Sequence, residues 1–313
     1  MTTNRRRILL AVDGSQQSLE AVHYVSRCFP PQKIEIRLFN VLNKVPEFFY
    51  DLGKQPQFQK SVIEIRAWER TIRDSIENFM GEAHRILTEQ GIPQEAITVE
   101  IREILRGTAK EIIAEAAKGY DGVVIGRFGL SKFKDLIIGS VASKLLSALT
   151  HLSLCVVGGR PETEKILLAV NESEGALRAV DYVAKMTAEV QREVTLLHVI
   201  RGFNILQQRD DFALDQDIEK IWLELTKHGI EPVFNEARNR LTKAGLEGAR
   251  IRTKIIAGAT SRAAAIVHEA RSGCIGTIVL GRRGLSATKE FLMGRVSNKV
   301  IQASKSEAVW VVS

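Results

Sequence analysis

Residues 8–27, ILLAVDGSQQSLEAVHYVSR, occur a second time at 166–185 as ILLAVNESEGALRAVDYVAK. Eleven of the 20 aligned positions are identical, and the alignment needs no gap. In both copies a continuous apolar run comes first, and apolar residues at helical spacing follow it. This pattern predicts a buried strand that leads into a helix, which is the repeating unit of an α/β fold.

A second pair of segments repeats in the same order. DGVVIGRFGLSKFKDLIIGSVASKLL (121–146) matches GTIVLGRRGLSATKEFLMGRVSNKVI (276–301). The first pair is shifted by 158 residues and the second by 155, so the two copies are collinear and nearly equal in length. A repeat of this kind indicates a duplicated domain. We expect one domain in residues 1–160 and the other in 161–313, joined near 158–164.

Strands and helices alternate along each copy. Several of the strand segments are apolar runs, which is typical of parallel strands covered on both faces. We predict an α/β fold in which each copy is a doubly wound, five-stranded parallel sheet. In the first copy the expected strands are 7–12, 33–42, 97–103, 121–126 and 153–158, and the expected helices are 18–29, 61–90, 108–118 and the segment after Gly139.

The composition is that of an ordinary globular protein, with 45% hydrophobic and 26% charged residues and 7 prolines in 313 residues. The length suits two average domains. The net charge of +7 is spread evenly, because residues 1–160 hold 22 Lys and Arg against 18 Asp and Glu, and the remainder 22 against 19. Nucleic-acid binders more often concentrate positive charge on one face, so we expect no nucleic-acid partner.

The cysteines predict neither a disulfide framework nor a zinc site. They are odd in number, far apart, and lack the paired spacing of either. We expect each to be a small buried apolar residue. No stretch approaches the roughly 18 apolar residues of a membrane span, and the first apolar run is too short for a signal peptide. We therefore expect a cytoplasmic protein without a membrane partner. The cysteines are Cys28, Cys155 and Cys274.

The segment GRFGLSKFKDLIIGS, residues 126–140, places three glycines directly after the fourth expected strand. In an open parallel sheet ligands bind beyond the carboxyl ends of the strands, so this loop and Asp13, after the first strand, belong to the same edge. The first two glycines can adopt positive φ and let the backbone approach a phosphate. Gly139 and Ser140 begin the next helix, where unpaired N–H groups attract an anion.

A purely structural alternative stays open at this point. The usual phosphate-loop signatures, GxxxxGK[ST] and GxGxxG after the first strand, are absent. In this alternative the glycines only turn the chain and Ser140 only caps a helix. The spacing by itself does not decide between a phosphate cradle and a turn.

Three separated blocks occur in order: ILLAVDGS, the G-2x-G-9x-G-S loop after VVIG, and the final strand SLCVVG. With them the whole chain resembles the universal stress protein family in its tandem two-domain form. The resemblance implies a doubly wound fold of the adenine nucleotide alpha hydrolase-like type. It implies ATP or another adenine nucleotide as the ligand, because many members bind ATP through this loop, whereas others lack it and do not. Members pair through their last strands, so we expect the two copies to pair with each other, the chain to form a homodimer, or both.

Carried over position by position, the resemblance implies a nucleotide site in the first copy. Asp13 would lie near the ribose or a Mg²⁺ ion held with ATP, and Val41 would contact the adenine. A carboxylate suits either task, because it accepts from ribose hydroxyls and binds hard cations. For the side chain of Arg127, contact with a γ-phosphate and solvation at the surface are both open. The phosphates would be held by Gly126, Arg127, Gly129, Gly139, Ser140 and Val141.

The second copy keeps the three glycines but changes their neighbours. Asn171 stands at the place of the aspartate and is a poorer Mg²⁺ ligand. Glu172 replaces a glycine and would repel a phosphate if it pointed inward. Arg295 stands where the helix-start serine should be, and it either binds a phosphate or fills the phosphate position. We expect a degenerate second site and one ATP per chain. The second site would comprise Asn171, Gly281, Gly284, Gly294 and Arg295.

No dedicated catalytic constellation accompanies the loop. GxSxG, HExxH and paired carboxylates are absent there, and of the six histidines only His198 is expected near a site. We expect an ATP-binding protein of stress response or signalling that hydrolyses ATP slowly or not at all. A nucleotide-independent interaction scaffold is the alternative, and an adenylating enzyme is a third hypothesis that rests on fold analogy. The aromatic segment 43–62 has no assigned role.

Overall fold

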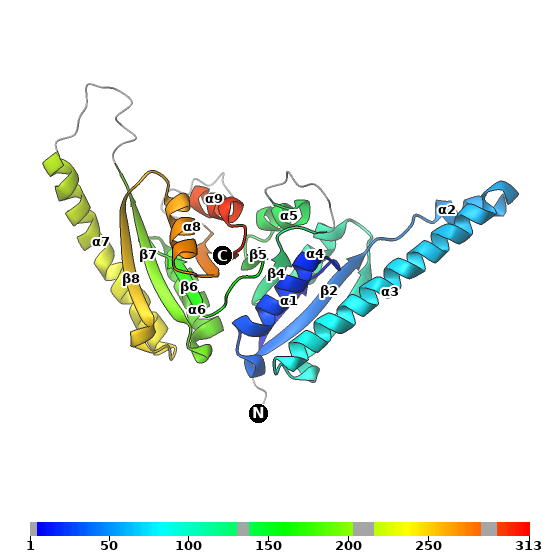
Figure 1. Ribbon diagram of the computed structural model, residues 1–313, viewed down its shortest axis with the longest axis horizontal. Helices are drawn as coiled ribbons and strands as arrows, with labels where there is room; N and C mark the ends of the chain where they lie inside the picture. Colours follow the sequence, from blue (N-terminus) through cyan, green and yellow to red (C-terminus); the bar gives the residue numbers. More distant parts are fainter. Residues whose placement is uncertain (1–4, 130–137, 203–215, 283–292) are drawn as a thin grey trace, which may run out of the picture.

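The computed structural model describes residues 5–129, 138–202, 216–282 and 293–313. In this part of the chain ten strands form one sheet, in the order β3-β2-β1-β4-β5-β10-β9-β6-β7-β8. Each half contributes five neighbouring strands, and every strand pair within a half is parallel. Figure 1 shows the sheet along the middle of the molecule with helices on both sides.

The elements of the two halves follow one another in the same sequence. The strands are β1 (Arg6–Ala11), β2 (Ile34–Leu42), β3 (Ile97–Glu103), β4 (Gly122–Gly126), β5 (Leu154–Val157), β6 (Lys165–Ala169), β7 (Glu193–Arg201), β8 (Ile251–Ala259), β9 (Thr277–Gly281) and β10 (Ala308–Val312). The helices are α1 (Gln16–Cys28), α2 (Phe48–Asp51), α3 (Gln59–Glu89), α4 (Thr108–Ala116), α5 (Ser140–Ala148), α6 (Glu174–Thr187), α7 (Gln216–Lys243), α8 (Arg262–Ser272) and α9 (Arg295–Ala303). Short 3₁₀ turns are η1 (Pro31–Lys33), η2 (Leu52–Lys54), η3 (Pro56–Phe58), η4 (Gln94–Ala96), η5 (Ala188–Val190) and η7 (Gly248–Arg250).

The core has two layers, one on each face of the sheet. In β1, Ile8 and Leu10 point into one layer, and Leu9 and Ala11 point into the other. Residues of α1, α3, α6 and α7 cover the first layer, and residues of α4, α5, α8 and α9 cover the second. Because helices bury both faces, the central strands β4, β5, β9 and β10 are almost entirely buried and apolar, whereas the edge strands β3 and β8 carry exposed polar residues.

The two halves meet at β5 and β10, which pair antiparallel. Trp310 of β10 donates from Nε1 to the Tyr24 hydroxyl at 3.0 Å, and that hydroxyl lies 3.1 Å from Oγ1 of Thr277. These side chains are buried and their polar atoms are paired, so the contact carries no penalty for unpaired polar groups. A Cβ at Gly122 would lie 2.6 Å from the Tyr182 hydroxyl, which explains the glycine at this close approach.

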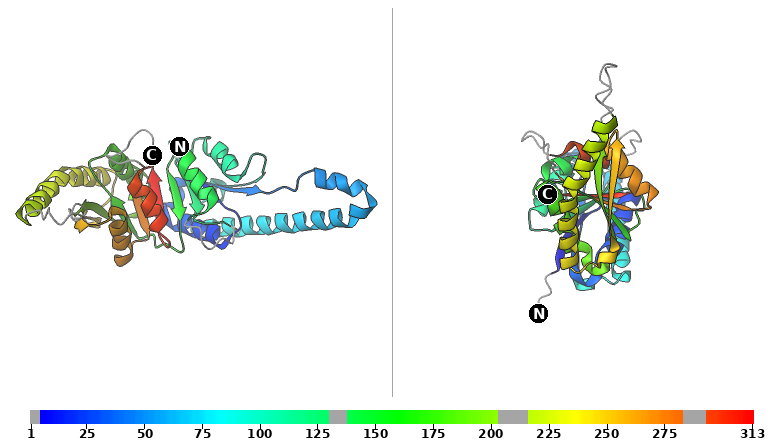
Figure 2. Two further views of the ribbon diagram at one scale, coloured as in Figure 1. Left: turned by 90° about the horizontal axis from the view of Figure 1, so that it is seen from above. Right: turned by 90° about the vertical axis from the view of Figure 1, so that its left-hand side faces the viewer.

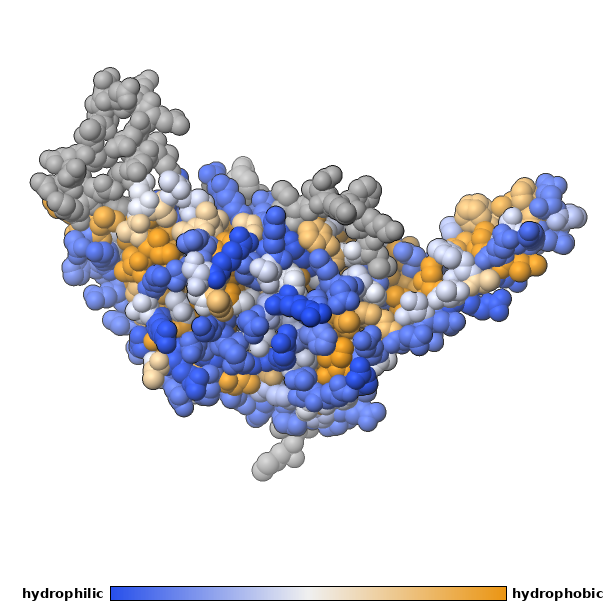
Figure 3. Space-filling model, in the orientation of Figure 1, coloured by the Kyte–Doolittle hydropathy of each residue, from blue (hydrophilic) through white to orange (hydrophobic). Residues whose placement is uncertain are grey.

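The segment between β2 and β3 forms an arm, residues 43–75, that extends from the body (Figures 1 and 2). Helix α3 has 31 residues, which makes it about 46 Å long. The short elements η2 and η3 contact α3, and the Tyr50 hydroxyl of α2 donates to the Glu69 carboxylate of α3. Exposed apolar side chains gather on the arm, as Figure 3 shows, and they include Phe48 (58% exposed), Ile63 (66%) and Trp68 (57%).

The predicted fold class is confirmed, because the sheet is mostly parallel and helices alternate with its strands in both halves. The expectation for the cysteines is confirmed at Cys28 and Cys155, which are buried. It is wrong at Cys274, which is exposed in the turn after α8 with a φ of 50°. None of the helices in the described ranges is long and apolar enough to cross a membrane.

Candidate functional site

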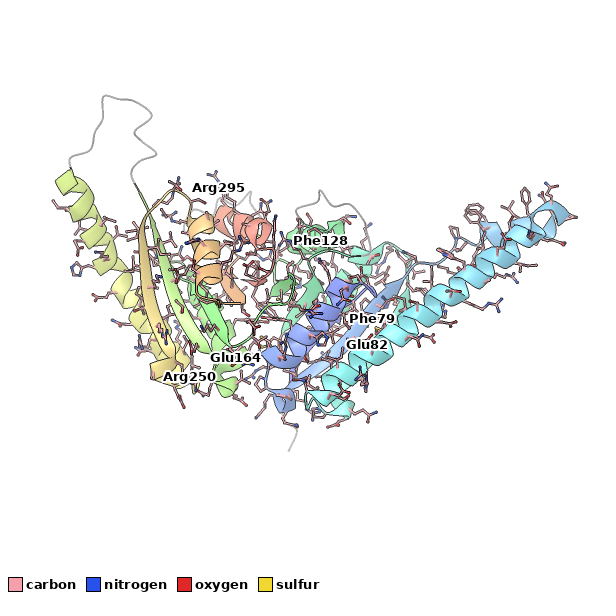
Figure 4. All side chains as sticks on the ribbon, in the orientation of Figure 1. Phe79, Glu82, Phe128, Glu164, Arg250 and Arg295 are labelled. Carbon is pink, nitrogen blue, oxygen red and sulfur yellow. The ribbon has the colours of Figure 1, made fainter. Side chains whose placement is uncertain are left out.

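A pocket of about 380 Å³ opens at the carboxyl edge of the first half. Its walls come from the ends of β1, β2 and β4, from the first residues of α4 and α5, and from side chains of α3. In Figure 4, Phe128 of this pocket and Arg295 of the second half lie along one edge of the molecule, opposite Glu164 and Arg250. The lining includes every residue predicted for the first site: Asp13, Val41, Gly126, Arg127, Gly129, Gly139, Ser140 and Val141.

Asp13 follows β1, and its carboxylate is held in a tight turn. Its Oδ1 accepts from the backbone N–H of Ser15 at 3.0 Å, and the N–H of Asp13 reaches Oγ of Ser18 at 3.4 Å. Gly14 between them has a φ of +82°, a conformation that favours glycine. A Cβ at Gly129 would lie only 2.3 Å from Oδ2 of Asp13. Gly129 therefore lies directly against the carboxylate, and a side chain at this position would displace the carboxylate.

The loop glycines serve close packing and not the positive φ that we expected for Gly126 and Gly129. A Cβ at Gly126 would lie 3.1 Å from the backbone of Gln17 in α1. In the second half, a Cβ at Gly281 would lie 2.4 Å from the Gly175 carbonyl oxygen in α6. Since both positions let a helix approach the end of a strand, the glycine has a structural reason in each copy.

Helix α5 begins at Ser140, and Gly139 is its N-cap residue without a side-chain hydrogen bond. The alternative in which Ser140 caps the helix is therefore wrong, because Ser140 is the first helical residue. The N–H of Gly139 donates to the carbonyl of Arg127 at 2.9 Å, which ties the helix start to the end of β4. A helix start leaves N–H groups without intrahelical partners, and those of α5 lie beside the pocket. The helix dipole adds about 0.3–1 kcal/mol for an anion placed there.

The side chain of Arg127 has a role that neither of our alternatives described. Arg127 is 3% exposed. Its guanidinium donates to the carbonyl oxygens of Ile301 at 2.6 Å, Gln302 at 2.9 Å and Ser304, at the end of α9. Cations are favoured at helix C-termini, where carbonyl groups lack intrahelical partners. Arg127 therefore bonds to the other half, and it is neither solvated nor directed as a phosphate ligand.

Arg282 in the second half repeats this contact in the opposite direction. Its guanidinium donates to the carbonyl oxygens of Leu146 at 2.7 Å and Leu149 at 2.5 Å, at the end of α5, and to Oγ of Ser313 at 2.9 Å. Each half thus extends an arginine, from the loop that follows its fourth strand, to the last turn of the other half's helix. We call Arg127 and Arg282 the crossed arginines.

Asn40, Trp68 and Ile72 line the first pocket, although the sequence did not single them out for it. Asn40 is 2% exposed and donates from Nδ2 to the Val12 carbonyl at 2.9 Å, while its Oδ1 has no hydrogen-bond partner in the described part of the chain. A buried acceptor without a partner suits a ligand that donates a hydrogen bond. A signal for Asn40 was present in the sequence, because the equivalent residue of the second copy, His198, is also a polar residue within a strand.

A second pocket, of about 320 Å³, lies at the equivalent edge of the second half. Its lining includes Asn171, Gly281, Gly294 and Arg295, and also His198 and Arg262. Gly284, the remaining residue predicted for this site, lies outside the described residues. Glu172 is not among the lining residues; its Oε1 points towards Gly229 of α7, 3.6 Å from where a Cβ would stand. Its side chain is therefore not part of the pocket wall, although its charge acts on the lining residue His198.

No cluster of three or more metal-ligating side chains occurs within the described ranges. Asp13 is the single carboxylate among the described residues that line the first pocket. One carboxylate is enough only for a Mg²⁺ ion that takes its other ligands from phosphates and water, which is the usual arrangement with a nucleotide. The first pocket fits Mg²⁺ bound together with a triphosphate, and it does not fit a metal site made by the protein alone.

Comparison with known proteins relates both halves to one family. The model of the Universal stress protein family matches residues 4–151 and again residues 162–313. Universal stress protein YxiE of Bacillus subtilis is 27% identical over 143 residues, which are 45% of this chain and 93% of that protein. Universal stress protein MJ0577 of Methanocaldococcus jannaschii is 28% identical over 155 residues, 47% of this chain and 94% of that protein.

A solved structure is similar over the full length. The crystal structure of a universal stress protein from Archaeoglobus fulgidus gives a TM-score of 0.58 and 19% identity, covering 100% of this chain and 99% of that one. At this identity the likeness concerns the fold alone.

Proposed function

Since the chain belongs to the universal stress protein family, we propose that it binds ATP, or another adenine nucleotide, in the pocket of its first half and acts in stress response or signalling. The observation that carries the proposal is the convergence of Asp13, Gly129 and the start of α5 on one pocket of nucleotide size. Gly129 leaves no room for a side chain beside the carboxylate, so only backbone separates Asp13 from the pocket at this point.

The roles of the residues follow from their places around the pocket. Val41, partly buried at the end of β2, supports the adenine, and the free acceptor Oδ1 of Asn40 lies where an amino group can donate to it. Asp13 binds the ribose hydroxyls or Mg²⁺. The first N–H groups of α5, at Ser140 and Val141, hold the phosphates. When bound, Mg²⁺ would neutralise phosphate charge.

The proposal is one of binding with slow or no turnover. Among the described lining residues of the first pocket there is no histidine and no carboxylate besides Asp13. A hydrolase needs a base that positions water in addition to the group that holds the metal. Asp13 cannot do both at once. Release of phosphate at a steady rate well above that of a Gly139→Val variant would contradict this part of the proposal.

We also propose that the halves work as an intramolecular pair in the cytoplasm. The antiparallel contact of β5 with β10 and the crossed arginines support this pairing. Whether two such chains then form a homodimer is a separate prediction, which sedimentation at several protein concentrations checks. A monomer at all concentrations would remove the homodimer and leave the intramolecular pair.

The deciding experiment measures nucleotide bound per purified full-length chain, by mass spectrometry after heat release, and the thermal shift with Mg·ATP. We expect one ATP per chain, and about 2.7 kcal/mol of stabilisation when ATP is at 100 times its Kd. Gly139→Val combined with Asp13→Ala should abolish the shift, because a Cβ at Gly139 would lie 3.0 Å from the Arg127 carbonyl oxygen.

The matched control is Gly294→Val. Gly294 is the N-cap of α9, and its N–H donates to the Arg282 carbonyl at 2.8 Å, as Gly139 does to Arg127. We expect this variant to keep ATP binding. If Gly294→Val removed the bound ATP and the double variant kept it, the assignment of the working pocket would be reversed.

An interaction scaffold that needs no nucleotide is the second candidate, and the exposed apolar side chains of the arm favour it. Phe48, Ile63 and Trp68 are each more than half exposed. Trp68 also lines the first pocket, so the arm and the pocket share a side chain. Absence of any thermal shift at millimolar Mg·ATP would exclude the ATP proposal and leave the scaffold.

A further inference from the structure

We propose that the second pocket is a separate site for a small organic anion, with a phosphate or carboxylate group, that binds without a divalent cation. The proposal does not depend on ATP binding in the first pocket. It rests on two observations. The two equivalent pockets differ in the sign of their charged side chains, and hydrogen bonds to the protein fix the orientation of polar side chains in the second pocket.

Two helices begin in the wall of each pocket, and the first residues of these helices differ between the two pockets. At the start of α4 and α5 the first pocket has Thr108 and Ser140. At the start of α8 and α9 the second pocket has Arg262 and Arg295. Two hydroxyl groups are thus replaced by two guanidinium groups, each at a helix end where the dipole already favours an anion.

The negative side chain of the first pocket is also absent from the second. None of the residues described in the lining of the second pocket is a carboxylate. Asn171 stands at the place of Asp13, and its Oδ1 accepts from the hydroxyl of Ser173 at 2.6 Å and from its N–H at 3.2 Å. Since the amide oxygen is engaged in this turn, Asn171 can offer its amide N–H groups to a ligand but is a poor ligand for Mg²⁺.

Arg262 is fixed at the pocket by the end of β7. Its Nε donates to the carbonyl of Val199 at 3.2 Å. Burial and, after it, the neighbouring cation Arg201 lower the pKa of Arg262, although a guanidinium remains charged at neutral pH. A bound anion would relieve this repulsion between like charges.

His198 supplies a third polar group from β7. Its Nδ1 lies 2.9 Å from the Val170 carbonyl oxygen, which can only accept, so Nδ1 carries the proton. The pKa of His198 is lowered, mainly by burial, which leaves the imidazole neutral at pH 7 with Nε2 as an acceptor. Nε2 therefore suits a hydroxyl or amino group of the ligand.

The remaining wall is apolar, with Leu197, Ile266 and Leu280. Together these groups describe a ligand with an anionic group for the arginines, a donor for His198 and an apolar or ring portion. A volume of about 320 Å³ is large enough for a molecule of the size of a mononucleotide. AMP has these features and serves as the probe, and inorganic phosphate serves as a probe for the anionic group alone.

The test is calorimetric titration of the full-length chain with AMP in EDTA, in the background of Gly139→Val and Asp13→Ala, which disables the first pocket. We expect one AMP per chain, competition by inorganic phosphate, and affinity that falls as salt rises. Arg262→Thr and Arg295→Ser, which restore the residues of the first pocket, should each weaken binding at least tenfold.

Arg250→Thr is the control for net charge. Arg250 is paired with Glu247 at the opposite edge of the molecule (Figure 4), and its removal should leave AMP affinity within twofold. Circular dichroism of each variant shows that it is folded. The proposal is overturned if the two pocket variants bind AMP as tightly as their parent, if Arg250→Thr weakens binding as much as they do, or if binding needs Mg²⁺. Loss of Mg·ATP binding in the chain with an intact first pocket would count against the proposed function and not against this site.

Discussion

The two pockets share a backbone framework and differ in charge. In both, a glycine at the end of the fourth strand, Gly126 or Gly281, lets a helix of the same half pack closely. A second glycine, Gly139 or Gly294, is the N-cap of the next helix, and its N–H donates to the carbonyl of a crossed arginine. The first pocket then carries Asp13 with hydroxyls, and the second carries Asn171 with guanidinium groups. The shared glycines are therefore explained by the fold, and we propose that the residues next to them determine which ligand binds.

The largest difference that we predict concerns acid stability. Glu115 of α4 is fully buried and pairs with Arg102 at 2.5 Å, Lys118 at 2.7 Å and the Tyr120 hydroxyl at 2.8 Å. Its counterpart in α8, Glu269, is less buried and pairs with Lys254 at 2.8 Å. Glu115→Gln should cost about 3 kcal/mol of unfolding free energy at pH 7, because it removes the buried carboxylate that Arg102, Lys118 and Tyr120 share. Denaturant unfolding measures this.

The pH dependence of that effect has a definite sign. Burial raises the pKa of Glu115, but hydrogen bonds from Lys118, Tyr120 and Arg102 outweigh burial and lower the pKa to about 2 from 4.5. A lowered pKa stabilises the fold above about pH 4.5, and this stabilisation is lost as the pH falls towards 2. The difference between wild type and Glu115→Gln should therefore shrink over that window. A constant difference down to pH 2 would exclude the charge as its cause.

We expect the two crossed arginines to contribute equally to the unfolding free energy. Arg127→Ala and Arg282→Ala each remove charged hydrogen bonds to helix carbonyls, and each should lower the unfolding free energy by about 2 kcal/mol. Thermal and urea unfolding of the two variants check the equality. If Arg127→Ala instead weakened nucleotide binding with little loss of stability, its guanidinium would be a phosphate ligand after all.

Asp13 and Asn171 follow the first strand of their halves. Exchanging these residue types should change how strongly ligand binding in each pocket depends on Mg²⁺. Asp13→Asn should weaken Mg·ATP binding about tenfold, about 1.4 kcal/mol, and change metal-free ATP binding less. Titrations with and without EDTA measure both. Asn171→Asp is the reciprocal variant, and it should weaken metal-free anion binding in the second pocket. An equal loss with and without Mg²⁺ in Asp13→Asn would mean that Asp13 serves the ribose only.

The smallest effect is expected when Asn40 is changed to His, the residue of its counterpart His198, because both side chains contact equivalent carbonyl groups. Asn40 donates to Val12 and His198 pairs with Val170, both at 2.9 Å. Asn40→His should therefore cost less than about 1 kcal/mol of stability, since the donor is kept. Asn40→Leu leaves the carbonyl unpaired and should cost about 1–3 kcal/mol. Equal costs in urea unfolding would show that volume, and not the hydrogen bond, decides this position.

The sequence predicted the strands closely because apolar runs, and apolar residues that alternate with polar ones, are typical of strands when polar loops flank them. The expected strand 97–103 and β3 have the same bounds, and the expected helix 61–90 differs from α3 by two residues at its start and one at its end. Two residues of the first pocket could also be predicted from the sequence: Asp13, which follows a strand end, and Ser140, which begins a helix. The contacts of the Arg127 side chain could not be predicted, because its partners are backbone atoms more than 170 residues away and backbone atoms leave no signal in the sequence. Trp68 was not predicted as a pocket residue, because the apolar pattern of a long helix does not show which end of the sheet each of its turns lies beside.

The crossed arginines have a consequence for how the two halves could diverge. Nearly all of their partners are main-chain carbonyl groups, which every residue type provides. Substitutions at the surface of α5 or α9 therefore do not alter the contact between the halves. In a dimer of two identical single-domain chains, any change in one site occurs in both. In this fused chain each pocket can acquire substitutions separately, while the junction that holds the pockets together is insensitive to them.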